Sequence, residues 1–289
     1  MAVMFCDTNC ELWFDKAREL DLKVIKMPYT IGGKEFYYDL GEKTDFKNFY
    51  DEMRSGKTPS TSALNADNYK EYFEPYFKAG EDVLYVSFSD KLSATFTFMD
   101  QAVAELKEKY PKIKFVRFDT RAISLPAGMQ VYLAKKYMDG GHTIDETVEY
   151  LKDLTKHIAV EFVVDDLKYL KRGGRISGLQ AAVGTLLNFK PILKLSDDGK
   201  IVNTTKVNGR TKAITHIVEG IKAKGTDLDK YPIAIIHADC EADALKLKER
   251  LTAELNNQNL DIWIQPIGPV IGTHCGPGTL ALVYHGTGR

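Results

Sequence analysis

Short apolar runs alternate with longer amphipathic stretches through the first half of the chain. The runs predicted to be strands are 2–6, 22–30, 82–87 and 113–118. The run at 82–87 shows no polar alternation, which is typical of a parallel strand covered on both faces. The stretches predicted to be helices are 45–55, 65–78, 92–110, 124–138 and 143–156. This β-loop-α order predicts a doubly wound, mainly parallel sheet.

The pattern changes after residue 157. A strand is predicted at 158–164, and the runs 191–195 and 200–207 flank an Asp198-Gly199 turn that indicates a hairpin. The remaining elements predicted are strands at 231–237 and 262–267, a helix at 241–256, and a closing hairpin formed by 269–274 and 279–285. We therefore expect two α/β domains, 1–157 and 158–289, the second with a mixed or antiparallel sheet.

Composition and charge narrow the class of protein. The 39 basic and 40 acidic residues give a formal net charge of −1, which provides no overall field for nucleic acid or an anionic membrane. No apolar run approaches the roughly 18 to 20 residues of a membrane span, and no signal peptide is recognisable. The four cysteines lack zinc-site spacing and predict reduced thiols and no metal. We expect a cytoplasmic protein without stable membrane insertion.

The familiar motifs of enzyme active sites are absent from the sequence. It contains no Gly-rich dinucleotide fingerprint, no P-loop, no Gly-x-Ser-x-Gly elbow and no His-Glu-x-x-His. Asp7 follows the first strand, where an aspartyl nucleophile could lie, but such a residue is more often a turn or cap residue. We predict no catalytic residue and no cofactor. A small-molecule kinase or phosphatase that uses Asp7 or His274 is the alternative.

Two loops are rich in hydroxyl groups. Residues 58–62 read Thr-Pro-Ser-Thr-Ser and precede a predicted helix, so Thr61 and Ser62 can donate hydrogen bonds to an anion. Ser93 lies in the loop after the strand at 82–87, and ligands of open α/β sheets bind beyond the carboxyl ends of strands. Each hydroxyl could instead be an ordinary helix N-cap.

One histidine and three arginines complete the candidate residues. His274 lies in the Gly-rich segment 272–278, where a tight turn would present it to donate a hydrogen bond or to become cationic. Arg172, Arg175 and Arg210 belong to basic segments that could dock a protein or a phosphate. A solvated charged surface is the alternative for these arginines.

Taken together, these segments resemble the DegV family of bacterial lipid-binding proteins. The resemblance covers nearly the whole chain, and its most specific stretches are YLKRGGRIS at 169–177 and IGTHCGPG at 271–278. It implies two α/β domains with a fatty acid between them. It also implies that Thr61, Ser93 and His274 bind the carboxylate, with Ser62 as a weaker candidate.

The resemblance further implies a protein partner. In well-understood members, a separate ATP-dependent kinase phosphorylates the bound acid to an acyl phosphate, and basic loops that correspond to Arg172, Arg175 and Arg210 face that kinase. A lipid transport or regulatory protein without a kinase is a third possibility. The chain departs from the family pattern at Ala63-Leu64, where Gln-Pro is usual, and at Ala94, where Gly is usual; the Ala94 methyl is expected close to the head group.

Burial of the tail dominates the expected binding energy. About fourteen CH₂ groups contribute on the order of 11 kcal/mol, from which association and ordering costs of several kcal/mol are subtracted. The apolar segment 179–189 could line the required tunnel, although an ordinary core helix is the more common explanation for such a segment.

Overall fold

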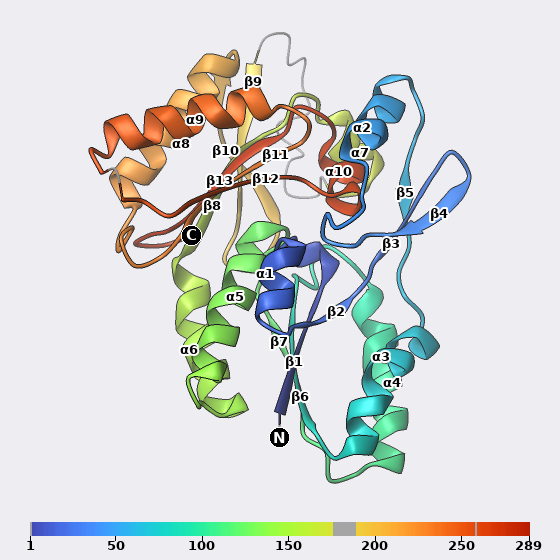
Figure 1. Ribbon diagram of the computed structural model, residues 1–289. Helices are drawn as coiled ribbons and strands as arrows, with labels where there is room; N and C mark the ends of the chain where they lie inside the picture. The colour runs from blue at the N-terminus through green and yellow to red at the C-terminus, as the bar shows by residue number, and fades with distance from the viewer. Residues whose placement is uncertain (1, 176–188, 258) are drawn as a thin grey trace.

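Three β-sheets organise the computed structural model, which describes residues 2–175, 189–257 and 259–289 (Figure 1). A parallel four-stranded sheet lies in the N-terminal half, a mixed six-stranded sheet lies in the C-terminal half, and a small three-stranded sheet lies beside them. The mixed α/β fold class predicted from the sequence is confirmed.

The four-stranded sheet is doubly wound. Its strands, in spatial order, are β2 (Lys23–Ile25), β1 (Ala2–Asp7), β6 (Asp82–Ser87) and β7 (Phe115–Asp119). Figure 1 shows α3 (Ala66–Ala79) and α4 (Thr95–Lys109) on one side of this sheet, and α5 (Leu125–Asp139) and α6 (Ile144–His157) on the other. The chain winds in opposite directions from β1 and β6, so their carboxyl ends form a topological switch point, where ligands of such sheets bind.

The six-stranded sheet begins immediately after α6. Its strands, in spatial order, are β10 (Ile201–Asn208), β9 (Phe189–Leu195), β8 (Ile158–Val163), β13 (Leu280–His285), β11 (Ile233–His237) and β12 (Ile262–Pro266). Only the β11–β12 pair is parallel, which gives the mixed sheet expected for this half.

The two faces of this sheet follow the alternation of side chains along each strand. Ile235 and Leu282 belong to a cluster with the apolar residues of α8 (Arg210–Lys224) and α9 (Glu241–Glu254). Their neighbours Ile236 and Ala281 point to the opposite face, toward the N-terminal half. Strands with both faces buried explain the nearly continuous apolar runs in this part of the sequence.

The third sheet extends from the N-terminal half toward the six-stranded sheet. Its order is β4 (Lys34–Tyr37), β3 (Pro28–Ile31) and β5 (Ser60–Thr61), with α1 (Phe14–Glu19) before it and α2 (Phe46–Arg54) between β4 and β5. The single strand predicted for 22–30 is therefore wrong. The run divides into β2 and β3, which belong to different sheets, and β3 begins at Pro28, which has no N–H to continue the parallel ladder.

One further prediction differs from the structure, and one helix was not predicted. Residues 269–274 form no hairpin strand but belong to α10 (Pro269–Cys275), which starts with Pro after the Gly268 cap, a favoured helix start. Helix α8 was not predicted, although Ala213, Ile217 and Ile221 recur with helical spacing on its buried face. The proposed tunnel segment 179–189 lies outside the described residues except for Phe189, which begins β9.

The two halves share one hydrophobic core. A single cluster of buried side chains runs from Val3 and Phe5 in β1 to Ala281 and Val283 in β13. The outer face of the six-stranded sheet has a second, smaller cluster. The chain crosses between the halves at His157, where α6 ends and β8 begins.

Candidate functional site

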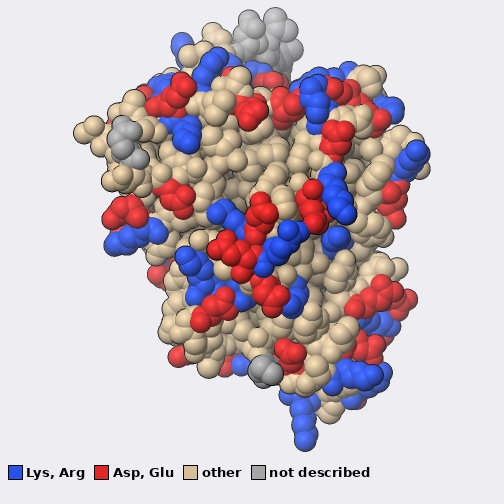
Figure 2. Space-filling view, in the orientation of Figure 1, with Lys and Arg blue, Asp and Glu red and all other residues tan. Residues whose placement is uncertain are grey.

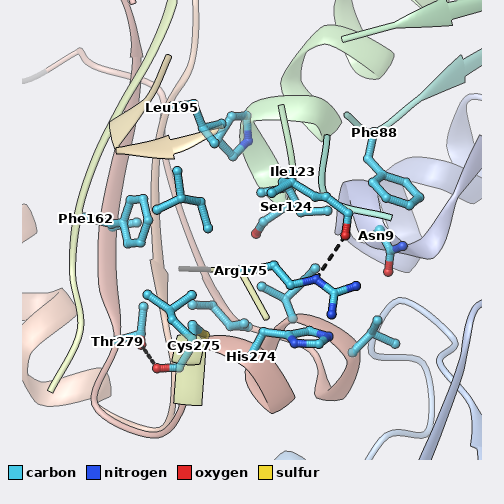
Figure 3. A pocket seen from close by; sticks show the side chains of 18 of the residues that line it. Asn9, Phe88, Ile123, Ser124, Phe162, Arg175, Leu195, His274, Cys275 and Thr279 are labelled. Atoms are coloured by element: carbon cyan, nitrogen blue, oxygen red, sulfur yellow. Dashed lines mark hydrogen bonds between the residues drawn. The ribbon is translucent and has the colours of Figure 1, made fainter. Parts of the chain in front are cut away.

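A largely apolar cavity lies between the parallel sheet and the six-stranded sheet (Figure 3). Its volume is about 110 Å³ for the centre of a water molecule, whereas a single water needs only about 10–15 Å³ on this measure. The apolar wall on the six-stranded sheet is formed by Val160, Phe162, Leu195, Ile201, Ile236 and Ala281. Several of these side chains are direct cross-strand neighbours, since Ala281 pairs with both Ile236 and Phe162.

Two of the polar side chains that line this cavity are in contact and define what we call its polar end. Thr61 Oγ1 and His274 Nε2 are 2.9 Å apart and hydrogen bonded, although 213 residues separate them in the chain. Ser62 and Ser93 line the same cavity. The structure therefore places the four residues predicted as carboxylate ligands in one cavity wall, with Thr61 and His274 in contact.

Thr61 and His274 are held by regular structure and not by a loose turn. Thr61 pairs with Tyr29 in the small sheet. His274 lies in the last turn of α10, whose start is anchored from the N-terminal half: Gly268 N–H donates to the Glu11 carboxylate, and the Tyr50 hydroxyl donates to the Ile267 carbonyl at 2.8 Å. These bonds fix the imidazole relative to the small sheet.

The environment of His274 keeps its imidazole neutral. Burial, with smaller contributions from the positive charges of Arg175 and Arg172, lowers the pKa of His274 to about 4. The cationic histidine considered from the sequence is therefore not the form favoured at neutral pH. Its Nδ1 has no hydrogen-bond partner among the described residues and lies against Gly173, where a Cβ atom would come within 2.2 Å.

Ser93 occupies the loop between β6 and α4. Its Oγ accepts the N–H of Thr95 at 3.3 Å, and a hydroxyl that accepts in this way keeps its proton for donation to a ligand. Ala94, the next residue, is exposed and is not part of the cavity wall, so the expectation that its methyl lies close to a head group stays a prediction.

Arg175 was predicted at a docking surface, but the structure places it in the cavity wall. Its Nε donates to the Leu92 carbonyl at 3.0 Å, and its Nη1 donates to the Gly173 carbonyl. Figure 3 shows its guanidinium beside the imidazole of His274. The chain turn at Gly173-Gly174 thus directs the Arg175 guanidinium into the polar end. The sequence pattern held no specific signal for the position of this guanidinium beside His274.

The other two arginines predicted to dock a partner lie outside the cavity wall. Arg172 is exposed, and its Nη1 donates to Thr58 Oγ1 at 3.4 Å, next to the segment that carries Thr61. Arg210 is half-buried and forms ion pairs with Asp243 at 2.9 Å and Asp165 at 3.6 Å. On the face shown in Figure 2, basic and acidic side chains are interspersed.

Three polar residues of the cavity wall were not considered in the sequence analysis: Asn9, Ser124 and Thr279. Asn9 follows β1 and Ser124 precedes α5, and both line the cavity. The rule that places ligands beyond the carboxyl ends of parallel strands could have identified Asn9, because it lies two residues after the strand ends at Asp7.

Two buried carboxyl groups lie behind the polar end. Asp7 accepts hydrogen bonds from the Tyr85 hydroxyl and the Asn9 N–H, both at 2.9 Å, and burial raises its pKa to about 7. Glu11 accepts from Ser124 and Gly268, and burial raises its pKa to about 8. Asp7 is fully buried and not part of the cavity wall, so it offers no exposed nucleophile there.

Two absences among the described residues bear on cofactors and membranes. No group of three or more His, Cys, Asp or Glu residues in this part of the chain has an arrangement that could hold a metal ion. Within the same residues, none of the helices combines the length and the apolar character that crossing a bilayer requires.

Comparison with known proteins places this chain in one family. Residues 2–286 match the model of the family described as "Uncharacterised protein, DegV family". A DegV domain-containing protein of Clostridium perfringens is 36% identical over 284 residues, which cover 98% of this chain and 97% of that protein. One from Lactococcus lactis is 33% identical over 90% of this chain and 89% of its own length.

Solved structures show the same architecture. A fatty acid binding DegV family protein from Streptococcus agalactiae superimposes with a TM-score of 0.84 at 29% identity, covering 98% of both chains. DegV from Bacillus subtilis, described as a fatty acid binding protein, gives a TM-score of 0.83 at 27% identity and the same coverage. On the match to the family model and the identity to the curated relatives, this chain belongs to the DegV family.

Proposed function

We propose that this chain binds a long-chain fatty acid in the cavity between its two large sheets. The carboxylate would lie at Thr61, Ser93 and His274, with Ser62 as a weaker contact. The observation that carries the proposal is an apolar cavity whose wall includes these hydroxyls and the imidazole, with Thr61 and His274 in direct contact. The relatives from S. agalactiae and B. subtilis, described as fatty acid binding, support it.

The proposed binding energy comes mainly from the tail. Each buried CH₂ contributes about 0.8 kcal/mol, so a tail of about fourteen such groups outweighs the association cost even if the head group contributes little. The wall formed by β8, β11 and β13 is suited to this because its side chains are aliphatic or aromatic. Specificity for an acid then depends on satisfying the buried carboxylate at the other end.

The polar end can satisfy a carboxylate without placing a fixed charge in contact with it. Thr61 and Ser93 each have a hydroxyl to donate, and neutral His274 can donate or accept according to its tautomer. The Arg175 guanidinium lies nearby and adds a favourable positive charge. A carboxylate bound mainly by neutral donors keeps its nucleophilic oxygens available for transfer chemistry.

Lipid analysis of the purified chain tests acyl binding directly. Native mass spectrometry should show one fatty acid for each chain, and protein stripped of lipid should take up a fluorescent long-chain acid. Ser93→Ala should weaken uptake about tenfold or more, the effect of losing one hydrogen bond to a charged group. Purified chain without lipid that also fails to take up acids of any length would refute the proposal.

We further propose that the chain is non-catalytic and presents the bound carboxylate to a separate ATP-dependent kinase. Arg172 supports this, since it is exposed and hydrogen bonded to Thr58 beside the polar end, where an approaching protein could contact it. Arg210 would contribute less to docking than a free arginine, because two carboxylates already pair with it. A kinase that uses ATP would place the chain in the cytoplasm, in agreement with its four free thiols.

A charge reversal with a matched control tests the kinase partner. Arg172→Glu should slow acyl-phosphate formation by a fatty acid kinase at least tenfold while fatty acid affinity stays unchanged. Lys246→Glu makes the same charge change at an exposed position on α9 and should affect neither quantity. Equal rates of acyl-phosphate formation for both variants would exclude Arg172 from docking. If the unaltered chain yields no acyl phosphate with any fatty acid kinase, a lipid carrier without a kinase partner is favoured.

A further inference from the structure

Asn9 lies at the switch point of the parallel sheet. It follows β1 directly, and the loop that carries Ser93 follows the neighbouring strand β6. Because both strands are parallel, these two segments meet at the same edge of the sheet. The adjacent Thr8 hydroxyl accepts the N–H of Met27, which precedes the strand that pairs with Thr61.

The backbone of Asn9 is fixed on both sides. Its N–H donates to Asp7 Oδ1 at 2.9 Å, and its carbonyl accepts the N–H of Ser124 at 2.7 Å. The residue belongs to the short 3₁₀ helix η1 (Thr8–Cys10) and is only 4% exposed. Its side chain is therefore held in the cavity wall and does not move with a flexible loop.

The carboxamide of Asn9 has one buried atom without a partner among the described residues. Its Oδ1 forms no hydrogen bond with any described residue, whereas the polar groups of Thr61, Ser124 and Thr279 in the same wall are bonded within the protein. Leaving a buried polar group unpaired costs on the order of 1–3 kcal/mol. A half-turn about the last side-chain torsion exchanges Oδ1 and Nδ2, so the amide can present a donor to the cavity.

Figure 3 places Asn9 at the polar end. It lies with Phe88 on the side to which the Arg175 guanidinium points, away from Phe162 and Leu195 in the apolar wall. A polar group of a ligand that reaches Thr61 and His274 therefore comes to the side of the cavity where Asn9 lies.

We propose that Asn9 is a further head-group ligand, whose amide Nδ2 donates a hydrogen bond to the fatty acid carboxylate. The inference rests on the proposed function and adds a specificity-determining residue to it. A carboxylate has about four lone-pair positions. Thr61 and His274 are hydrogen bonded to each other, which engages one of their protons, so this pair together with Ser93 and Ser62 supplies at most three donors. The amide supplies the fourth without adding a charge.

Binding of acids of different length to Asn9→Leu tests this role. Leu has a similar size but no polar atom, so its affinity for acids of twelve, fourteen, sixteen and eighteen carbons should fall by one common factor of about five to ten. Affinity for the corresponding methyl esters, which carry no charged oxygen, should change less than twofold. A contact with the tail would instead give a loss that depends on chain length and is the same for acid and ester.

Asn9→Asp provides a second variant if Asn9→Leu fails to fold. It has the same shape but places a negative charge beside the carboxylate, so the acids should bind more than tenfold more weakly at pH 8 while the esters are little affected. Unchanged acid affinity in both variants, or equal losses for acids and esters, would overturn the role of Asn9. Failure of the unaltered chain to bind any acid would instead overturn the proposed function.

Discussion

The two ends of the cavity are built from different kinds of structure. The apolar end is formed by strand residues of one sheet, where Ile236, Ala281 and Phe162 are cross-strand neighbours. The polar end is assembled from segments far apart in the sequence, including the two-residue strand that carries Thr61 and the helix that carries His274. Strand alternation fixes the first wall, whereas the second depends on a few hydrogen bonds between the halves.

Because of this difference, the two ends are suited to recognise different parts of a ligand. A sheet face offers uniform apolar contact, which suits a ligand part that is recognised by area and length. Segments beyond strand ends bring unlike groups to one point, which suits a ligand part that is recognised by hydrogen bonds. Changes at the apolar end should therefore alter chain-length preference, and changes at the polar end should affect all acids alike.

Ala281→Phe should have the largest effect and should depend on chain length. The ring would fill the apolar end and exclude about four CH₂ groups, which at about 0.8 kcal/mol each weakens binding of a sixteen-carbon acid roughly 200-fold. A twelve-carbon acid should lose less than fivefold. Titration of both acids by displacement of a fluorescent probe measures this, and equal losses would show that the sheet wall does not contact the tail.

Gly173→Ala should disturb the polar end next most strongly. The new methyl would lie 2.2 Å from His274 Nδ1, so the imidazole must move and its bond to Thr61 breaks. Overpacking of this kind costs about 1–3 kcal/mol. Thermal unfolding and acid binding should both report the loss. In the His274→Ala background the same change should cost little, and an undiminished cost there would locate the strain elsewhere.

The pH dependence of stability should be concentrated at the polar end. Folding raises the pKa of Glu11 to about 8, mainly through burial, so the native chain binds a proton that the unfolded chain releases near pH 4.5. The contribution of Glu11 to stability is fully present below that pH and is lost as pH rises toward 8, by about 1.4 kcal/mol per unit.

Urea unfolding of Glu11→Gln measures this contribution. The variant should lose less stability than the unaltered chain between pH 5 and pH 8, since it has no proton to release there. Asp7, whose pKa is raised to about 7, should add a similar slope that both proteins share. Parallel stability profiles for the two proteins would mean that Glu11 is already ionised in the fold.

Thr61→Val should have the smallest effect of the four. It keeps the shape but removes the hydroxyl bonded to His274, which should weaken every acid about fivefold, or roughly 1 kcal/mol. Ser62→Ala serves as the control and should change affinity less, because Ser62 is exposed. Isothermal titration calorimetry with acids of different length measures these affinities. A loss of affinity that grew with chain length would contradict the proposed difference between the two ends.

The fold was predictable where a single sequence pattern is enough to identify a strand or a hairpin. The apolar run at 82–87 correctly predicted β6, and the Asp198-Gly199 turn correctly predicted the β9–β10 hairpin. Residues 269–274 were predicted wrongly because an apolar run of that length does not distinguish a strand from a short buried helix. Tertiary contacts decide the matter, since Gly272 packs against Tyr50 and Phe49 of α2.

The candidate site was predictable only in part, for a related reason. Residue type and a resemblance to a known family pointed to Thr61, Ser93 and His274. They did not show that Arg175 turns back into the cavity, because that depends on bonds to Leu92 and Gly173. Asn9 was missed because an Asn after a strand resembles any turn residue until its missing partner is seen.

The hydrophobic core shared by the two halves determines how the molecule unfolds. Since one cluster joins β1 to β13, neither half can be released without exposing apolar surface of the other. Heating should accordingly produce a single calorimetric transition, and a protease that cuts near His157 should leave the fragments associated. Two separate melting steps would mean that the halves are autonomous folding units joined by little more than a covalent link.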